Sequence, residues 1–327
     1  MKQTRWMFAA AFVMAAVLVA PLARAEAPKS QPAKPIAKQN PPAGVRIERD
    51  VKYGDAPGVA NLLDVYLPEK AEGELPLIIW IHGGGWQAGD KAGCPAVGMV
   101  GRGYVAASLN YRFSQEAIFP AQIEDCKGAI RFLRAHAKEY HIDPNRIGVW
   151  GASAGGHLVA LLGTSGSAKE IEGTVGGNLD QTSRVEAVCD WFGPTDMSRF
   201  WEEAGTGNIF KPNPAKSPID KLFGGPVSEK KDLVAKANPL TFVSKESAPF
   251  LIIHGDHDKL VPVAQSQILN DALKAAGVES ELVVLEGAGH GGPQFTQPKV
   301  LKQIADFFDK HLNPTAKPVE LPHEQSR

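Results

Sequence analysis

The middle of the chain alternates short, β-branched apolar runs with longer amphipathic runs, and this alternation constrains the fold more than any other feature. It is typical of strands joined by crossover helices in a mostly parallel sheet, and several apolar runs are continuous, as strands covered on both faces require. Strands are expected at residues 45–51, 62–67, 77–82, 105–110, 147–151, 185–191, 250–254 and 281–285. Helices are expected at residues 95–102, 121–140, 155–163, 263–276 and 297–311. The sequence therefore predicts an α/β fold with a doubly wound, mostly parallel eight-stranded sheet.

The N-terminus of the 327-residue chain has the pattern of a signal peptide. Lys2 and Arg5 precede an apolar run, and Ala23-Arg24-Ala25 supplies the small-x-small cleavage pattern. A membrane-spanning helix needs about 20 apolar residues, and Pro21 interrupts this run. We therefore expect cleavage after Ala25, no membrane anchor, and a secreted or periplasmic protein.

The chain divides into four parts by composition. Residues 1–25 are the expected signal peptide, and residues 26–44, rich in proline and lysine, are the expected linker. Residues 45–312 are the expected α/β domain, and residues 313–327 a flexible, proline-containing tail. Within the domain, the glycine- and proline-rich stretch at 198–225 is expected to form a small cap-like insertion beside the site, because loops of this length are usually functional.

Charge and cysteine content exclude several classes of protein. The formal net charge is −1, and it becomes about −4 once the leader is removed, so a nucleic-acid partner is not expected. Cys94, Cys126 and Cys189 have no C-x-x-C spacing, so a zinc site is not expected. We favour a disulfide between Cys94 and Cys126, because both lie in segments that flank the fourth expected strand, although the spacing does not fix the pairing.

A G-x-S-x-G motif at residues 151–155 follows one expected strand and precedes an expected helix. In such a sharp turn the hydroxyl of Ser153 is exposed above the sheet, and the flanking glycines avoid clashes with neighbouring backbone. The N-terminus of the following helix adds a positive partial charge near an oxyanion. The motif alone would also fit a glycine-rich turn with a bystander serine, but its position between strand and helix favours a nucleophile at Ser153.

A glycine run, His82-Gly83-Gly84-Gly85-Trp86, follows the strand expected at 77–82. Successive glycines let backbone N–H groups point at a developing oxyanion, so the amides of Gly84, Gly85 and Ala154 are the candidate donors. The alternatives for a bare glycine run are a flexible turn and a phosphate-binding loop. The phosphate-binding loop is excluded because the chain lacks G-x-x-x-x-G-K-[ST].

A serine nucleophile needs a base that a third group orients. His290 lies in a glycine-rich run directly after the last expected strand, where small neighbours allow a close approach to Ser153. Asp256 and Asp258 both follow the strand expected at 250–254; Asp258 lies nearer the next helix, where a turn can direct it at His290, whereas Asp256 is better placed to brace the loop. We predict Ser153, Asp258 and His290 as the catalytic residues.

These motifs, in the chain order Ser, Asp, His, resemble the α/β-hydrolase superfamily. They are the HGGGW run, the G-x-S-x-G turn, H-G-x-x-D-x-x-V-P at 254–262 and the loop around His290, with further likeness at 107–112, 119–122 and 191–196. The chain resembles in particular the feruloyl/acetyl-xylan esterase-like (BD-FAE-like) group and the hormone-sensitive-lipase-type carboxylesterases, over about residues 45–311. This resemblance implies the α/β-hydrolase fold, with Ser153 as nucleophile, His290 as base and Asp258 as orienting acid. The glycines after His290 depart from the family, where many relatives carry a bulkier residue, and this departure bears on specificity.

The resemblance implies a secreted serine carboxylesterase that works through an acyl-enzyme on Ser153, without a metal or an organic cofactor. Acetyl or feruloyl esters of polysaccharides are the implied substrates. Trp86, Tyr111 and Trp191 are candidate substrate-binding residues, with packing in the core as an equal alternative. A prolyl-oligopeptidase-like peptidase is a further alternative, but about 20 linker residues cannot form its N-terminal propeller. A non-catalytic binding protein on the same fold is the last, and the presence of all three catalytic residues argues against it.

Overall fold

The computed structural model describes the following parts of the chain: residues 41–71, 73–200 and 217–314. The expected signal peptide at 1–25 and most of the linker at 26–44 lie outside the described residues. So do most of the tail at 313–327 and residues 201–216 of the expected cap.

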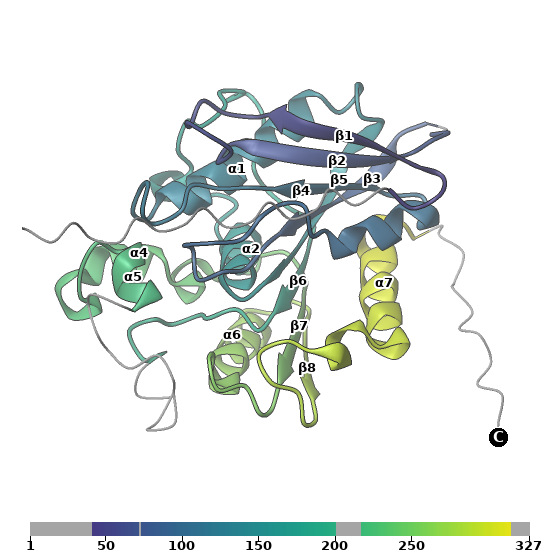
Figure 1. Ribbon diagram of the computed structural model, residues 1–327. Helices are drawn as coiled ribbons and strands as arrows, with labels where there is room; N and C mark the ends of the chain where they lie inside the picture. Colours follow the sequence, from purple (N-terminus) through teal and green to yellow (C-terminus); the bar gives the residue numbers. More distant parts are fainter. Residues whose placement is uncertain (1–40, 72, 201–216, 315–327) are drawn as a thin grey trace, which may run out of the picture. The chain divides into compact units, whose positions relative to one another are not determined.

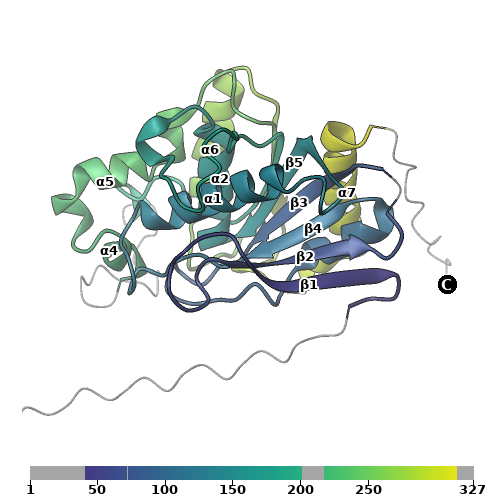
Figure 2. The ribbon, with the colours of Figure 1, turned by 90° about the horizontal axis from the view of Figure 1, so that it is seen from above.

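An eight-stranded sheet organises the described residues, in the strand order β1-β2-β4-β3-β5-β6-β7-β8 (Figure 1). Its strands are β1 (Val45–Lys52), β2 (Leu62–Pro68), β3 (Leu75–Ile81), β4 (Val105–Leu109), β5 (Ile142–Ala152), β6 (Ala187–Trp191), β7 (Phe250–Gly255) and β8 (Ser280–Leu285). The β1–β2 and β2–β4 pairs are antiparallel, and the other neighbouring pairs are parallel. Figure 2 shows β1 and β2 side by side at one edge. The predicted α/β fold with a mostly parallel eight-stranded sheet is confirmed.

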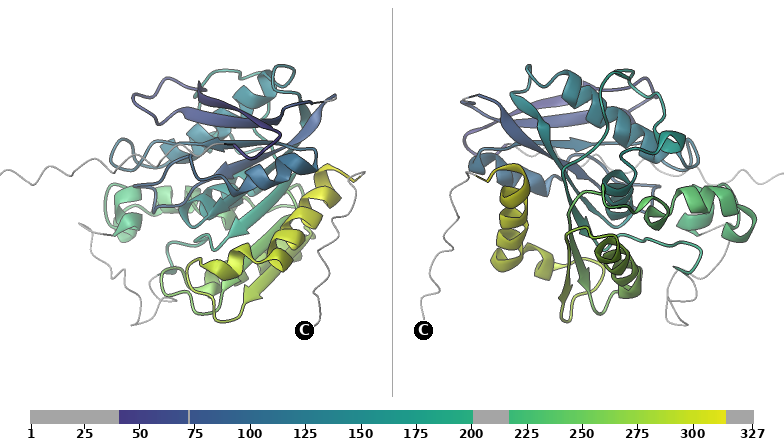
Figure 3. Two further views of the ribbon diagram at one scale, coloured as in Figure 1. Left: turned by 45° about the vertical axis from the view of Figure 1, so that its right-hand side comes forward. Right: turned by 180° about the vertical axis from the view of Figure 1, so that it is seen from behind.

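Helices cover both faces of this sheet. They are α1 (Ala121–Ala135), α2 (Ala154–Thr164), α4 (Pro218–Leu222), α5 (Lys231–Lys236), α6 (Val263–Ala275) and α7 (Pro298–Leu312), with the 3-10 helices η1 (Pro95–Arg102), η2 (Lys169–Ile171), η3 (Val227–Glu229), η4 (Pro239–Phe242) and η5 (Pro293–Thr296). The α1, α2 and α6 helices lie on one face, and η1 and α7 on the other (Figure 3). No helix in the described part of the chain is long and apolar enough to cross a membrane.

The two faces of the sheet bury separate apolar clusters. Neighbouring residues on a strand point to opposite faces, so Ile79 of β3 packs with the α1–α2–α6 side, whereas Ile78 packs with the η1–α7 side. Strands that are covered on both faces must be apolar at consecutive positions, which explains why the sequence shows continuous apolar runs. The sheet is therefore a rigid platform, and the loops at the carboxyl ends of its parallel strands are held in fixed positions.

Three elements differ clearly from the predictions. The helix expected at 121–140 ends at Ala135, five residues early. Residues 95–102 form the 3-10 helix η1, because Gly98 and Gly101 weaken an α-helix. Strand β5 begins at Ile142, five residues before the predicted start, because Ile142 pairs with Leu75 of β3. The intervening Asp-Pro-Asn residues have low strand propensity, so the sequence pattern gives no sign of this extension.

The expected disulfide between Cys94 and Cys126 is wrong, since all three cysteines are free. Cys126 lies in the cluster on the α1–α2–α6 face, and Cys94 packs against the cluster on the η1–α7 face. The sheet therefore lies between the two thiols. Burial raises the pKa of the Cys94 thiol to about 12, so this thiol stays protonated and unreactive.

Candidate active site

The turn between β5 and α2 holds Ser153 in a strained backbone conformation. Its φ is 57° and its ψ is −118°, outside the regions that a residue with a side chain normally adopts. The amide of Ser153 donates to the carbonyl oxygen of Trp191 at 2.8 Å, which ties the turn to β6. A β-carbon at Gly155 would lie 2.0 Å from the carbonyl oxygen of Ile81, so α2 begins against β3 only because this residue is glycine. The result is a serine raised above the end of the sheet.

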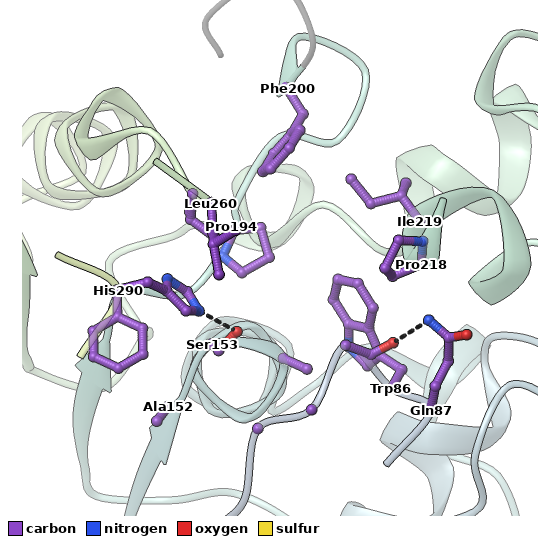
Figure 4. A pocket seen from close by; sticks show the side chains of 16 residues that line it. Trp86, Gln87, Ala152, Ser153, Pro194, Phe200, Pro218, Ile219, Leu260 and His290 are labelled. Atoms are coloured by element: carbon purple, nitrogen blue, oxygen red, sulfur yellow. Dashed lines mark hydrogen bonds between the residues drawn. The ribbon is translucent and has the colours of Figure 1, made fainter. Parts of the chain in front are cut away.

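Ser153, His290 and Asp258 form a continuous hydrogen-bond chain. Ser153 Oγ donates to Nε2 of His290 at 2.8 Å, as Figure 4 shows, and Nδ1 of His290 donates to Oδ2 of Asp258 at 2.7 Å. Because Nδ1 faces a carboxylate, it carries the ring proton, and Nε2 is left to accept the serine proton. The structure therefore brings together the three residues that the sequence pattern singles out, with the polarity that serine activation needs.

The carboxylate of Asp258 is fully buried. Burial alone would raise its pKa, but hydrogen bonds from His254 and His290 outweigh this effect and hold the pKa of Asp258 well below its usual range. Oδ1 also accepts the amides of Leu260 at 2.8 Å and Val261 at 3.0 Å. Asp258 therefore remains an anion beside His290.

Asp256 has different partners. Its Oδ1 accepts the amide of Gly287 at 2.7 Å and lies 2.7 Å from Nδ1 of His257. It therefore joins the loop after β7 to the loop that carries His290. Of the two aspartates that compete in the sequence, Asp258 is the one in contact with His290, and Asp256 braces the loop.

The glycine run after β3 passes directly beside the nucleophile. A β-carbon at Gly83 would lie 3.2 Å from Cβ of Ser153, and Gly84 and Gly85 have φ values of 111° and 60°. Among the described residues, the amides of Gly84, Gly85 and Ala154 donate no hydrogen bond to a protein acceptor. All three residues line the cavity next to Ser153, so their amides remain candidate donors to an oxyanion.

A buried lysine anchors the end of this loop. Nζ of Lys91 donates to the carboxylates of Asp64 at 2.6 Å and Asp50 at 2.7 Å, and the Lys91 amide donates to Oδ1 of Asn110 at 2.7 Å. Burial lowers the pKa of Lys91, but the two carboxylates raise it overall, so the ammonium stays charged. The segment that follows the glycine run is thus fixed to β2.

A cavity of about 530 Å³ lies next to Ser153, and most of its lining is apolar. Figure 4 shows Leu260 and Pro194 near His290, Trp86, Pro218 and Ile219 across from them, and Phe200 further out. The full lining is Gly83, Gly84, Gly85, Trp86, Gln87, Ala152, Ser153, Ala154, Phe192, Pro194, Phe200, Pro218, Ile219, Leu260, Val261 and His290. The cavity can take an apolar group beside a nucleophile and three amide donors.

Of the three aromatic residues predicted to bind substrate, only Trp86 lines this cavity. The prediction for Tyr111 is wrong: its hydroxyl donates to the carbonyl oxygen of His82 at 3.1 Å, and its ring stacks on that of His82. The prediction for Trp191 is also wrong, because its ring packs edge-to-face against Trp80 and Trp150 in the cluster on the η1–α7 face.

The pattern misses Phe192, which follows Trp191 and does line the cavity. The Phe192 ring lies 4.6 Å from that of His290, between centroids. Its φ of 44° turns the backbone at the end of β6. Strand alternation does not give this signal, because β6 ends at Trp191 and both residues belong to the cluster on the η1–α7 face. Pro218 begins α4 and Leu260 lies in the loop after β7, and neither position carries a sequence signal for the cavity. Within the described ranges, no three His, Cys, Asp or Glu side chains are grouped as metal ligands.

Comparison with known proteins gives a consistent group of relatives. The BD-FAE family model matches residues 63–273. Esterase LipC of Mycobacterium tuberculosis is 33% identical over 256 residues, which cover 74% of this chain and 59% of LipC. The chain spans about half to three-fifths of the length of such curated relatives.

Two solved structures match this chain over most of their own length. A truncated form of a carbohydrate esterase from gut microbiota superimposes with a TM-score of 0.76 and 35% identity, covering 83% of this chain and 99% of that one. An acetyl ester-xyloside bifunctional hydrolase from Caldicellulosiruptor lactoaceticus gives a TM-score of 0.61 and 28% identity, covering 76% of this chain and 87% of that one. The expected α/β-hydrolase fold is therefore confirmed.

Proposed function

This chain belongs to the BD-FAE family, and from that membership we propose that it is a serine carboxylic ester hydrolase that works through an acyl-enzyme on Ser153. One observation carries the proposal: the hydrogen-bond chain from Ser153 Oγ through His290 to Asp258, at 2.8 and 2.7 Å. A serine hydroxyl is a weak nucleophile until a correctly oriented base takes its proton. Here His290 is the base, and Asp258 is the acid that orients it.

Acylation follows from this geometry. Ser153 Oγ attacks the ester carbonyl carbon while its proton passes to Nε2 of His290, and Asp258 stabilises the resulting imidazolium. The amides of Gly84, Gly85 and Ala154 would hold the negative charge on the former carbonyl oxygen. His290 then gives the proton to the leaving alkoxide as its bond to the carbonyl carbon breaks, which leaves the acyl group on Ser153.

Deacylation repeats these steps with water. Nε2 of His290 takes a proton from water as the water oxygen attacks the acyl carbon, and the same amides receive the negative charge. The bond to Ser153 Oγ then breaks, and His290 returns the proton to it. The products are the free carboxylic acid and the enzyme in its starting state.

We propose acetyl or feruloyl esters of polysaccharides as the substrate class. Two observations support this choice. The carbohydrate esterase and the acetyl ester-xyloside hydrolase are similar over most of this chain. The apolar walls at Trp86, Phe192 and Leu260 suit a small acyl or an aromatic acid group, and a cavity of about 530 Å³ has room for either.

Export remains part of the proposal and rests on the sequence of residues 1–25 alone. An exported esterase would meet polysaccharide outside the cytoplasm. N-terminal sequencing of the protein recovered from the producing cell tests this, with Glu26 expected as the first residue. A chain that retains Met1 would contradict it.

Turnover assays test the proposed activity. Purified protein of residues 26–327 is expected to hydrolyse p-nitrophenyl acetate and to release acetate from acetylated xylan, whereas Ser153→Ala is expected to lose several orders of magnitude in kcat. Equal turnover by the two proteins would overturn the proposal. Cleavage of a proline-containing peptide without ester hydrolysis would favour the peptidase, and binding of acetylated xylan without turnover would favour a non-catalytic protein.

A further inference from the structure

The carboxylate of Asp258 receives a hydrogen bond from a second histidine. His254, on β7, places Nε2 at 3.2 Å from Oδ2 of Asp258, and both side chains are fully buried. Oδ2 is the oxygen that also accepts Nδ1 of His290. Each carboxylate oxygen therefore has two donors, because the amides of Leu260 and Val261 bind Oδ1.

The protonation of His254 follows from its neighbours. Nε2 lies 2.9 Å from the carbonyl oxygen of Val261 as well as 3.2 Å from Asp258, and neither group has a proton to give. Nε2 must therefore carry the proton, which is shared between these two acceptors. Nδ1 then accepts the hydroxyl proton of Ser266 at 2.7 Å. Ser266 lies in α6 and is fully buried, so it fixes the ring from the other side.

We propose that His254, held by Ser266, is a positioning residue that fixes Oδ2 of Asp258 in the orientation His290 needs throughout turnover. The inference rests on the proposed function, because it assigns a role within the same reaction. It adds a residue that does not touch the ester, Ser153 or His290. Of the two acceptors of its Nε2 proton, the Val261 carbonyl and Oδ2 of Asp258, only Asp258 is bonded to His290.

The need for such a residue follows from where the two histidines lie. His290 is partly exposed, at 17% of its side chain, and stands in a loop with three glycines at positive φ: Gly287, Gly291 and Gly292. His254 lies instead on β7, between β6 and β8, with no exposed side-chain surface. When His290 gives its Nε2 proton to the leaving group, its ring loses its positive charge, and the bond from Nδ1 to Oδ2 of Asp258 becomes weaker. The donor on β7 holds the carboxylate independently of that loop.

The experiment is a double-mutant cycle between His254 and Asp258, with kcat and KM measured on p-nitrophenyl acetate. His254→Leu is expected to lower kcat by about 10- to 100-fold, the range found when the hydrogen-bond partner of a metal-binding side chain is removed. KM should change less than about twofold, because His254 does not line the cavity. His254→Gln is expected to recover most of kcat, because the amide nitrogen can take the place of Nε2.

The decisive comparison uses Asp258→Ala as the background. In that background, adding His254→Leu should lower kcat by less than about twofold, because the carboxylate of Asp258, through which His254 acts, is absent. A loss in the Asp258→Ala background as large as in the wild type would overturn the proposal, and so would a Gln variant as impaired as the Leu variant. Ile304→Ala, a buried change in α7, is the control for lost stability and should leave kcat unchanged.

An NMR measurement separates this inference from the proposed activity. The Nδ1 proton of His290 in its bond to Asp258 is observed directly, without substrate. In His254→Leu it is expected to exchange with water faster than in the wild type, and an unchanged exchange rate would overturn the inference. If the wild type shows no Ser153-dependent turnover, the proposed function fails, and this measurement still decides the role of His254.

Discussion

A β-carbon at position 84 would lie 2.0 Å from the carbonyl oxygen of Ala88, so the backbone of Gly84 passes Ala88 at a distance that only glycine permits. The φ of Gly84 is 111°, which side chains also disfavour. The carbonyl oxygen of Gly84 accepts the amides of Gln87 and Ala88, which closes the loop on itself. The direction of the Gly84 amide is therefore set by packing within this loop.

Gly84→Ala is expected to lower kcat by about 100-fold or more, the usual cost of losing one oxyanion donor. The added methyl forces the loop away from Ala88, and the amide turns with it. Gly93→Ala is the matched control, because a β-carbon there meets nothing within 4 Å. Steady-state kinetics of both variants tests this, and equal kcat values would contradict the role of the Gly84 amide.

Substitutions of the two aspartates after β7 are expected to have different effects on catalysis and on stability. Asp258→Asn should lower kcat by about 10⁴-fold, because an amide in place of the carboxylate favours the wrong tautomer of His290. Asp256→Asn should keep kcat within about threefold and lower the melting temperature, since its contacts join two loops. Kinetics and thermal unfolding of both variants test the assignment. The reverse pattern would show that Asp256 is the catalytic acid.

The cavity wall is expected to set acyl preference through Trp86, whose ring meets that of His157 edge-to-face. Trp86→Ala should raise kcat/KM for p-nitrophenyl butyrate relative to acetate by roughly 10-fold, because two added methylenes gain about 0.8 kcal/mol each on burial. Trp191→Phe is the control: its ring is packed away from the cavity, so it should lower stability and leave the chain-length preference unchanged. An altered preference in Trp191→Phe alone would contradict the placement of both residues.

A buried carboxylate on β6 predicts a pH-dependent stability. Oδ1 of Asp190 accepts the Gly193 amide at 2.9 Å, Oδ2 has no partner among the described residues, and burial raises the pKa of Asp190 to about 6. The folded protein therefore binds more protons than the unfolded chain between about pH 4 and 6, so this group makes stability fall as pH rises through that interval. Asp190→Asn removes the effect.

Urea unfolding of Asp190→Asn and wild type at pH 4.5 and 8 tests this. The variant should gain stability relative to wild type as pH rises, by on the order of 2 kcal/mol, since each unit of pKa shift is worth about 1.4 kcal/mol. His157 acts in the opposite direction, because burial lowers its pKa to about 4, but it is present in both proteins and cancels in the comparison. A difference that stays constant with pH would contradict a buried, ionising Asp190.

The sequence predicts the sheet and the three catalytic candidates for the same physical reason. Strands covered on both faces must be continuously apolar, and reactive residues follow them where the chain turns, as Ser153 follows β5 and Asp258 follows β7. Each signal is local in sequence. The strand pairing of Ile142 with Leu75 joins residues far apart in sequence, so the sequence pattern does not predict the early start of β5.

The cavity wall could not be predicted in the same way. Pro218 at the start of α4, Leu260 after β7 and Phe192 after β6 line one cavity only because the fold brings three separate segments together. Trp191 shows the limit of reasoning from residue type: an aromatic side chain suits a core as well as a pocket, and one position along the chain decides between them. The disulfide prediction fails similarly, since nearness to one strand does not say on which face of the sheet a thiol lies.

The central claim is that Ser153 carries the acyl group. Mixing the protein with excess p-nitrophenyl acetate, quenching with acid during turnover, and mapping the peptides by mass spectrometry tests it directly. The mass of one acetyl group is expected on Ser153, and none on the Ser153→Ala protein treated in the same way. An acetyl group on another residue, or turnover by Ser153→Ala at the wild-type rate, would contradict the mechanism.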